Sequence, residues 1–161
     1  MIRNLLYLII FLVGGCSSSV GPAPRPEPPA PPPRAERSEA LLQALLAIGV
    51  DYRYGGKSPA TGFDCSGLVS HVYQEAWGIR LPPTTAAQSR AGVPVSLAEL
   101  QAGDLVFYDT LQRPYSHVGI YLGEGKFVHA PKTGAQVRIE SLRSNYWTQR
   151  FNGARRIEQG I

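Results

Sequence analysis

The chain has 161 residues and a mass of 17.5 kDa, enough for one compact domain together with some non-globular chain. Its hydrophobic content of 43% is ordinary for a folded protein, so we expect a single core. The formal net charge of +4 favours anionic partners only weakly, and the lysines and arginines are scattered, so the sequence argues against a nucleic-acid-binding protein.

The first fifteen residues have the pattern of an export signal. Arg3 precedes an apolar run from Leu5 to Val13, which is too short to span a bilayer because that takes about 20 apolar residues. Small residues then lead to Cys16, and this arrangement resembles the lipobox at which bacterial lipoproteins are cleaved and acylated. We therefore expect residues 1–15 to be a lipoprotein signal peptide and Cys16 to carry lipid. The alternative is an ordinary signal peptide with an incidental cysteine.

The segment 16–37 is expected to be an acylated, extended linker. By resemblance to Gram-negative lipoproteins, Ser17 after the cysteine indicates sorting to the periplasmic face of the outer membrane. Prolines stand at positions 22, 24, 26, 28, 29, 31, 32 and 33, and they remove backbone donors and fix φ. At ~3.1 Å per residue such a linker would hold the domain up to about 60 Å from the membrane. A plain disordered spacer is the alternative.

Residues 38–161 carry the patterns of a folded domain. Ser38 is suited to cap a helix whose apolar stripe consists of Leu41, Leu42, Leu45, Leu46 and Ile48 and which ends at Gly49. After a glycine-rich loop, Asp64 is suited to cap a second helix that begins at Cys65 and ends at Gly78. Helical spacing places Cys65 on the face that is expected to contact the core, with Leu68, Val69, Val72 and Ala76.

Four later segments have the composition of short strands separated by Gly, Asp and Pro. They are Leu105 to Tyr108, Val118 to Leu122, Phe127 to Ala130 and Val137 to Ile139. Helices followed by strands favour an α+β domain in which the early helices cover one face of an antiparallel sheet.

Cys65 is the candidate nucleophile. The unpaired amides and the dipole at a helix start favour the thiolate, so this position should lower the pKa of the thiol. The same amides are suited to stabilise an oxyanion on a cleaved carbonyl. A thiol nucleophile needs a base and a third group that orients the base, and His117 and His129 are the candidates. His71 lies further along the helix and is expected at the surface.

The two candidate histidines can cooperate only if the hairpin that joins them has the right register. A two-residue loop at Glu124-Gly125 would oppose Ile120 to His129 and place the histidines on opposite faces of the sheet. A three-residue loop with Gly125 in a left-handed bulge would instead set His129 opposite Gly119, with His117 as its diagonal neighbour. We therefore predict the three-residue loop.

Four stretches together carry a family resemblance. They are Tyr52-Arg53-Tyr54-Gly55-Gly56, Gly62-Phe63-Asp64-Cys65-Ser66-Gly67-Leu68-Val69, Ser116-His117-Val118-Gly119-Ile120-Tyr121 and Phe127-Val128-His129-Ala130. They resemble the NlpC family of cell-wall cysteine peptidases, particularly its lipoprotein murein endopeptidases. The resemblance covers nearly all of residues 38–157 and includes Gly103-Asp104-Leu105-Val106 and Ala154-Arg155-Arg156-Ile157.

The resemblance implies a papain-like α+β fold, no cofactor, and hydrolysis of amide bonds in peptidoglycan stem peptides or cross-links that contain diaminopimelate. The expected partners are peptidoglycan stem peptides and, through the lipid on Cys16, a membrane of the cell envelope. Nucleic acid is not an expected partner, and a monomer is the expected state although the sequence leaves the oligomeric state open.

The resemblance also assigns roles to individual residues. Cys65 would be the nucleophile, His117 the base and His129 the group that orients His117. Tyr54 would lie near the oxyanion, although a place in the aromatic core is equally open for it, and the cleft would be lined by Asp64, Ser66 and Ser116. After Leu81-Pro82 the family has arginine where this chain has Pro83, which leaves the bond preference in doubt.

Three other interpretations stay open. Cys65 and both histidines would be ordinary structural residues in the first. The second is a zinc site, because one cysteine and two histidines match the ligands of a catalytic metal, although such dispersed ligands are unusual for zinc. The third is a non-enzymatic envelope lipoprotein that binds peptidoglycan without cutting it.

Overall fold

A six-stranded antiparallel sheet forms the centre of the computed structural model, which describes residues 34–158. The strand order is β3-β8-β4-β5-β6-β7. The bounds are Val93–Val95 for β3, Leu105–Tyr108 for β4, His117–Gly123 for β5, Lys126–His129 for β6, Arg138–Ser141 for β7 and Phe151–Arg156 for β8. A separate small hairpin pairs β1 (Lys57–Ser58) with β2 (Gly62–Phe63).

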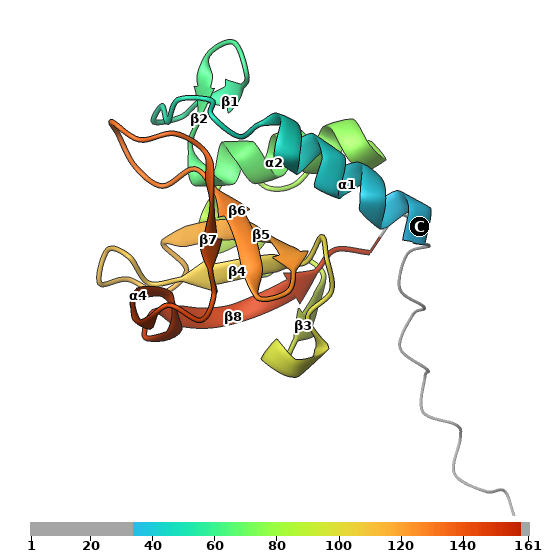
Figure 1. The fold of residues 1–161 in the computed structure, drawn as a ribbon, viewed down its shortest axis with the longest axis vertical. Coiled ribbons are helices and arrows are strands. Elements are labelled where there is room, and N and C mark those ends of the chain that lie inside the picture. Colours follow the sequence, from blue (N-terminus) through green and yellow to red (C-terminus); the bar gives the residue numbers. More distant parts are fainter. Residues whose placement is uncertain (1–33, 159–161) are drawn as a thin grey trace, which may run out of the picture. The chain divides into compact units, whose positions relative to one another are not determined.

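Helices cover one face of this sheet. The helices α1 (Arg34–Leu46) and α2 (Cys65–Trp77) lie on the same side of the sheet (Figure 1), and α2 contributes Leu68, Val69 and Val72 to a core that includes alternate residues of β4 and β5. The predicted α+β class, with early helices on one face of an antiparallel sheet, is confirmed.

The opposite face of the sheet has a second, smaller core that is rich in aromatic residues. Val106, Tyr108 and Phe127 point to this side, where Trp147 of the short helix α4 (Asn145–Thr148) covers them. Side chains alternate along each strand, so β4 and β5 supply residues to both cores. The residues of β5 therefore connect α2 on one face with α4 on the other.

Two smaller helices complete the domain. They are α3 (Thr85–Gln88), which Thr84 caps, and the 3-10 helix η1 (Leu97–Glu99), which follows Ser96. No helix within residues 34–158 combines the length and the apolar character that crossing a membrane requires.

The first helix differs from its prediction in two ways. It begins at Arg34, so Ser38 lies inside it rather than at its cap. It buries Ala40 and Ala44, and Ala47 just after its end is buried too, whereas leucines that were expected to pack are exposed, Leu46 most of all at 67%. Small side chains let one helix approach its neighbour closely, so the alanine face packs inward and the more hydrophobic leucine face is exposed to solvent.

The second helix is confirmed as predicted. Asp64 caps it by accepting a hydrogen bond from the amide of Gly67 at 2.6 Å, and Gly78 ends it in the left-handed conformation. Cys65 is therefore the first residue of the helix.

The four predicted strands are present as β4, β5, β6 and β7, with ends shifted by at most two residues, but β3 and β8 of this sheet and the short strands β1 and β2 were not predicted. Strand β8 lies inside the sheet although its sequence holds Asn152, Gly153 and two arginines. Arg156 is tolerated there because its guanidinium forms an ion pair at 2.8 Å with the buried carboxylate of Asp104. A strand that carries such a polar pair has no simple alternation of apolar and polar residues.

Candidate active site

The backbone around Cys65 is held by hydrogen bonds to Asp64. The Oδ1 atom of Asp64 accepts from the amide of Gly67 and from the hydroxyl of Ser66 at 3.0 Å, and its Oδ2 atom accepts from the amide of Gly55 at 2.9 Å. One carboxylate thus connects the loop that contains Gly55 and Gly56, called the glycine loop below, to the first turn of α2. This fixes where the Cys65 side chain leaves the helix.

The glycine loop and the helix also touch backbone to backbone. A Cβ atom on Gly67 would lie 2.0 Å from the carbonyl oxygen of Gly56, and one on Gly56 would lie 2.3 Å from the carbonyl oxygen of Gly62. Only glycine fits at these two positions, so the contact explains why both stretches are rich in glycine.

The thiol of Cys65 is protonated in the resting site. Burial, with a smaller contribution from the negative charge of Asp64, raises the pKa of this thiol to about 11. Hydrogen bonds from the amides of Val118, Ser66 and Cys65 itself act in the opposite direction but do not outweigh burial. The expectation that the helix start lowers the pKa is therefore wrong in its net direction, because desolvation exceeds the helix contribution.

The contact with Val118 places the sulfur beside strand β5. Val118 directly follows His117, the first residue of that strand, so the sulfur contacts the residue next to the candidate base. The side chain of Val118 belongs to the core under α2, whereas His117 stacks on Trp147 on the other side of the sheet, with ring centroids 5.7 Å apart.

His117 and His129 are joined by a hydrogen bond. The Nε2 atom of His117 and the Nδ1 atom of His129 lie 2.7 Å apart, and both residues are buried. Because Ile120 pairs with Val128, the same register continued by one residue sets His129 opposite Gly119, as predicted. The two histidines thus share one face of the sheet.

The hairpin reaches this register by a route that differs from the prediction. Gly123 pairs with Lys126, so the loop has only two residues, Glu124 and Gly125, with φ of 54° and 74°. The extra residue sits in a bulge between Tyr121 and Gly123 instead of in the loop. The predicted three-residue loop is therefore wrong, but the bulge gives the strands the same register that this loop was predicted to give.

Both histidines are neutral near pH 7. Burial lowers the pKa of His117 to about 4, and burial together with the neighbouring charges of His117 and Arg138 lowers the pKa of His129 strongly. In the hydrogen bond between them one nitrogen must donate. When Nε2 of His117 donates, its Nδ1 atom keeps a free lone pair and can act as a base.

The tautomer that makes His117 a base has a consequence for His129. Its Nδ1 atom then accepts, so its proton is on Nε2, and this nitrogen is buried without a hydrogen-bond partner among the described residues. The ring of His129 is enclosed by Phe127 and Trp147, at centroid distances of 5.1 and 5.0 Å. Aromatic walls therefore hold the ring in place.

The arrangement does not resemble a metal centre. The nitrogens by which the two histidines face each other are occupied by their mutual hydrogen bond, and within residues 34–158 no three His, Cys, Asp or Glu side chains are grouped to hold a metal ion. A half-buried thiol that contacts the residue after a neutral, hydrogen-bonded imidazole supplies the groups that a cysteine hydrolase needs.

Comparison with known proteins agrees with this geometry. The model of the NlpC/P60 family matches residues 49–156, which include Cys65, His117 and His129. The chain belongs to the NlpC/P60 family. The site described above is thus part of an NlpC/P60 domain.

Several relatives of this NlpC/P60 domain are similar over most of the chain. The murein DD-endopeptidase MepH of Escherichia coli (strain K12) is 45% identical over 121 residues, which cover 73% of this chain and 45% of that protein. The probable endopeptidase NlpC homolog of Haemophilus influenzae is 40% identical, covering 77% of this chain and 68% of that protein. The chain therefore spans less than half the length of the first of these relatives.

A solved structure supports the fold. A protein of Staphylococcus aureus subsp. aureus Mu50, described as similar to lipoprotein, NLP/P60 family, superimposes with a TM-score of 0.70 at 37% identity. The similar region covers 80% of this chain and 43% of that one.

The tyrosine beside the thiol is Tyr52 and not Tyr54. Tyr54 is 89% exposed, so its proposed place in the aromatic core is wrong. Tyr52 is half-buried, and burial followed by the nearby Cys65 and Asp64 raises the pKa of its hydroxyl. Of the two tyrosines, Tyr52 is therefore the one whose hydroxyl interacts with Cys65, and the role of Tyr54 near the oxyanion stays a prediction.

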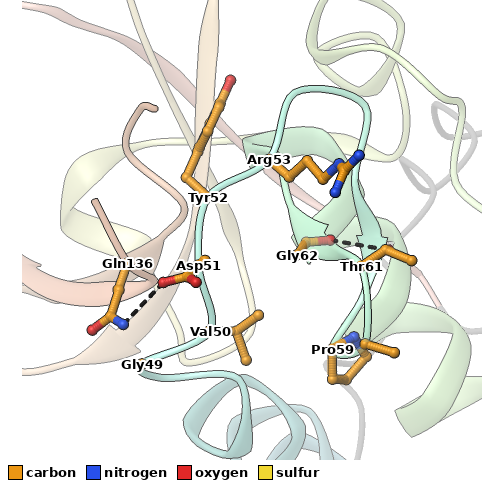
Figure 2. Close-up of a pocket in the computed structure, with 10 residues that line it drawn as sticks. Gly49, Val50, Asp51, Tyr52, Arg53, Pro59, Thr61, Gly62 and Gln136 are labelled. Carbon is orange, nitrogen blue, oxygen red and sulfur yellow. Dashed lines mark hydrogen bonds between the residues drawn. The ribbon is translucent and has the colours of Figure 1, made fainter. Parts of the chain in front are cut away.

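Contacts with Gln136 and with strand β2 hold segment 49–53, which carries Tyr52, in place. Gln136 donates to the carboxylate of Asp51 at 3.0 Å, and the backbone of Tyr52 bridges to Phe63 of β2. Between this segment and residues 59–62 lies an open hollow of about 650 Å³ (Figure 2).

The remaining predicted cleft residues have structural contacts. Ser66 donates to Asp64 and lies 3.1 Å from the carbonyl oxygen of Pro83, so Pro83 contributes its backbone at this point of the site. The hydroxyl of Ser116 accepts from the amides of Thr110 at 2.9 Å and Leu111 at 3.3 Å, which closes the loop before β5. Both serines thus support the site by holding its backbone.

Two further predictions concern cysteine and histidine. His71 is half-buried against the ring of Phe63, with centroids 5.1 Å apart, so it is less exposed than expected. Cys16, the predicted lipidation site, lies outside the described residues, as does most of the linker 16–37.

Proposed function

We propose that the chain is a peptidoglycan hydrolase that cleaves amide bonds in murein stem peptides or cross-links. Cys65 is the nucleophile, His117 the base, and His129 the residue that orients His117. The observation that carries this proposal is the buried hydrogen bond from His117 to His129 at the strand whose next amide contacts the sulfur of Cys65. The names of similar proteins, among them a murein DD-endopeptidase, support the substrate class.

The chemistry begins with a proton transfer. The Nδ1 atom of His117 takes the proton of the Cys65 thiol as the sulfur attacks the carbonyl carbon of the scissile amide, giving a tetrahedral adduct with a negative oxygen. The imidazolium that results is stabilised because Nε2–H still donates to His129. Since both groups start neutral, no charge is buried until substrate arrives.

The adduct then collapses. The C–N bond breaks, the nitrogen takes the proton from Nδ1 of His117 and leaves as an amine, and the acyl group stays on sulfur as a thioester. A water molecule, deprotonated by the same imidazole, attacks the thioester and releases the carboxylate and the thiol. The amide of Cys65 and the hydroxyl of Tyr52 are the donors that lie near the developing oxyanion.

Digestion of purified peptidoglycan tests the activity directly. The purified protein is incubated with muropeptides of defined cross-linking, and the products are identified by mass spectrometry. We expect fragments that differ from the substrate by the addition of water across one amide bond. The Cys65→Ser variant, which replaces the thiol by a hydroxyl of similar size, should lose about a thousandfold or more in rate.

The same assay separates the remaining alternatives. A peptidoglycan-binding protein without activity would give no fragments, and its binding would survive Cys65→Ser. A zinc hydrolase would lose activity with a chelator, whereas a thiol hydrolase loses it with an alkylating reagent and ignores the chelator. Fragments produced equally by wild type and Cys65→Ser would refute the assignment of the nucleophile.

The place of action that we propose is the cell envelope, with the protein anchored through lipid on Cys16 at the periplasmic face of the outer membrane. The signal-like residues 1–15, the cysteine and the proline-rich segment up to residue 37 support this proposal. Growth with labelled palmitate should label the protein. The Cys16→Ala variant should stay unlabelled and should leave the membrane fraction.

A further inference from the structure

A second hollow, of about 430 Å³, opens next to His117 on the sheet face that α4 covers. His117 is part of its wall, and Cys65 is not among its lining residues. Trp147 and the half-exposed Tyr146 form an aromatic side, and basic and acidic side chains from the loop after β6 and from β7 form the other. The hollow thus borders the proposed base but not the nucleophile.

The polar side of this hollow is positively charged overall. Lys132 and Arg138 carry two positive charges, and Glu140 carries one negative charge. Arg138 forms an ion pair with Glu140 at 2.8 Å, whereas Lys132 is exposed and forms no ion pair within residues 34–158. The charge of Arg138 also reaches the catalytic pair, because it helps to lower the pKa of His129. A free cation therefore lines the hollow beside the site.

The position of the hollow decides which part of a substrate would enter it. In the proposed mechanism His117 delivers its proton to the nitrogen of the leaving amine, so the atoms attached to that nitrogen pass directly by the imidazole. The acyl part stays on the sulfur of Cys65. Groups carried by the leaving amine consequently extend into the hollow that His117 lines.

We propose that Lys132, assisted by Arg138, recognises a free carboxylate on the leaving-amine side of the scissile bond. The preferred substrate is then a peptide in which the amine that is released belongs to an amino acid with an unmodified carboxylate, such as a diaminopimelate centre or a terminal residue. Tyr146 and Trp147 provide the apolar wall for its carbon chain. This inference rests on the proposed function and adds to it the residues that determine specificity.

Removing the charge of Glu140 should strengthen the carboxylate preference, whereas removing that of Lys132 should weaken it. Glu140 neutralises part of the positive charge at Arg138 and is 27% exposed at its side chain. Replacing it by glutamine keeps the size and removes the negative charge, which would free Arg138 for an anionic ligand. Loss of Lys132 and loss of Glu140 should therefore change selectivity in opposite directions.

Two synthetic stem peptides that differ in one group test the proposal. Both contain the same scissile amide, and the leaving residue carries a carboxylate in one and a carboxamide in the other. For wild type we expect kcat/KM to be about tenfold higher for the carboxylate, in line with a charge-assisted contact at a partly exposed site. The preference should fall as salt is raised, because the hollow is open to solvent.

Three variants then locate the preference. Lys132→Met should bring the ratio of the two rates close to one, and Glu140→Gln should raise it above the wild-type value. The matched control is Lys126→Met. It removes an exposed lysine at the start of β6, the strand that ends at His129, and it should keep the wild-type ratio. A circular-dichroism melt verifies that each variant is folded.

The outcomes distinguish failure of the proposed hydrolase activity from failure of the carboxylate site alone. If wild type cleaves neither peptide, the proposed function fails. If wild type cleaves both peptides with equal kcat/KM, or if Lys132→Met and Lys126→Met give the same ratio, the hydrolase stands and the carboxylate site is refuted.

Discussion

Asp64 has two opposing effects on the neighbouring Cys65. Its carboxylate organises the first turn of α2 through hydrogen bonds to Gly67 and Ser66. The same negative charge raises the pKa of the thiol and so disfavours the thiolate. Asp64 therefore makes the thiol less acidic and also fixes its position. This is consistent with the proposal that His117 deprotonates Cys65 only when substrate is bound.

This balance predicts the behaviour of Asp64→Asn. The amide oxygen can still cap the helix, but the negative charge is gone, so the pKa of Cys65 should fall below its value of about 11. The pH dependence of alkylation by iodoacetamide measures this pKa. Glu75→Gln, which removes an exposed charge from the same helix, is the control and should leave the alkylation midpoint in place. An unchanged midpoint in Asp64→Asn would show that its charge is not felt at the sulfur.

The pair Tyr52 and Tyr54 allows a matched test of the oxyanion donor. The hydroxyl of Tyr52 is near Cys65, whereas Tyr54 is 89% exposed. Tyr52→Phe should lower kcat by about a hundredfold with little change in KM, because a donor to the oxyanion acts mainly in the transition state. Tyr54→Phe should leave kcat near the wild-type value. Equal effects of the two changes would remove the special role of Tyr52.

At the scale of elements, the position of α2 depends on its contact with the glycine loop. A methyl group on Gly67 would meet the carbonyl oxygen of Gly56 at 2.0 Å, and neither backbone can move without shifting Cys65. We expect Gly67→Ala to lower the free energy of unfolding by about 1–3 kcal/mol and to reduce activity. Urea denaturation measures the first and muropeptide digestion the second.

A control for this variant lies further along the same helix. Gln74 is exposed on α2, and Gln74→Ala should change the free energy of unfolding by no more than about 0.5 kcal/mol. If Gly67→Ala were as stable and active as Gln74→Ala, the loop and the helix would not need their close contact.

The elements that sequence patterns predict well are those with local signals. Asp64 as a cap and Gly78 as a stop define α2 without any tertiary information, and both are where they were expected. The β5–β6 register was also predicted correctly, but the bulge at Leu122 was missed because a bulge and a longer loop leave the same count of residues.

The errors arise where tertiary contacts decide. Helix α1 shows its small residues to α2 and its leucines to solvent, which hydrophobic periodicity alone does not indicate. Strand β8 is hidden in the sequence because Arg156 is neutralised by Asp104, 52 residues away. The pKa of Cys65 follows burial rather than helix position, and burial is a property of the whole fold.

At the scale of the whole molecule, the site joins the two cores of the domain. The Cys65 helix packs on one face of the sheet, and the two histidines lie among the aromatic residues of the other. Strand β5 contributes to both cores, with the side chain of Val118 in the first and that of His117 stacked on Trp147 in the second. Correct spacing between thiol and imidazole therefore requires that both cores are formed.

The buried histidines also make the stability of the domain depend on pH. The folded pKa of His117 is about 4 and that of His129 is also lowered, whereas an unfolded histidine titrates near 6.5. Between these values the unfolded chain binds more protons than the folded one, so the stabilisation is complete above pH 6.5 and is lost progressively as the pH falls toward 4.

From pH 7 to pH 5 the free energy of unfolding should therefore fall by about 2 kcal/mol for each of the two histidines, since one pKa unit corresponds to about 1.4 kcal/mol. Urea denaturation of the purified protein at both pH values measures this difference. His129→Gln removes one of the two groups and keeps a hydrogen-bond acceptor for His117, so it should roughly halve the loss, even if the variant is less stable at every pH. An undiminished loss in His129→Gln would mean that folding does not lower the pKa of His129, which would contradict its burial as a neutral acceptor for His117.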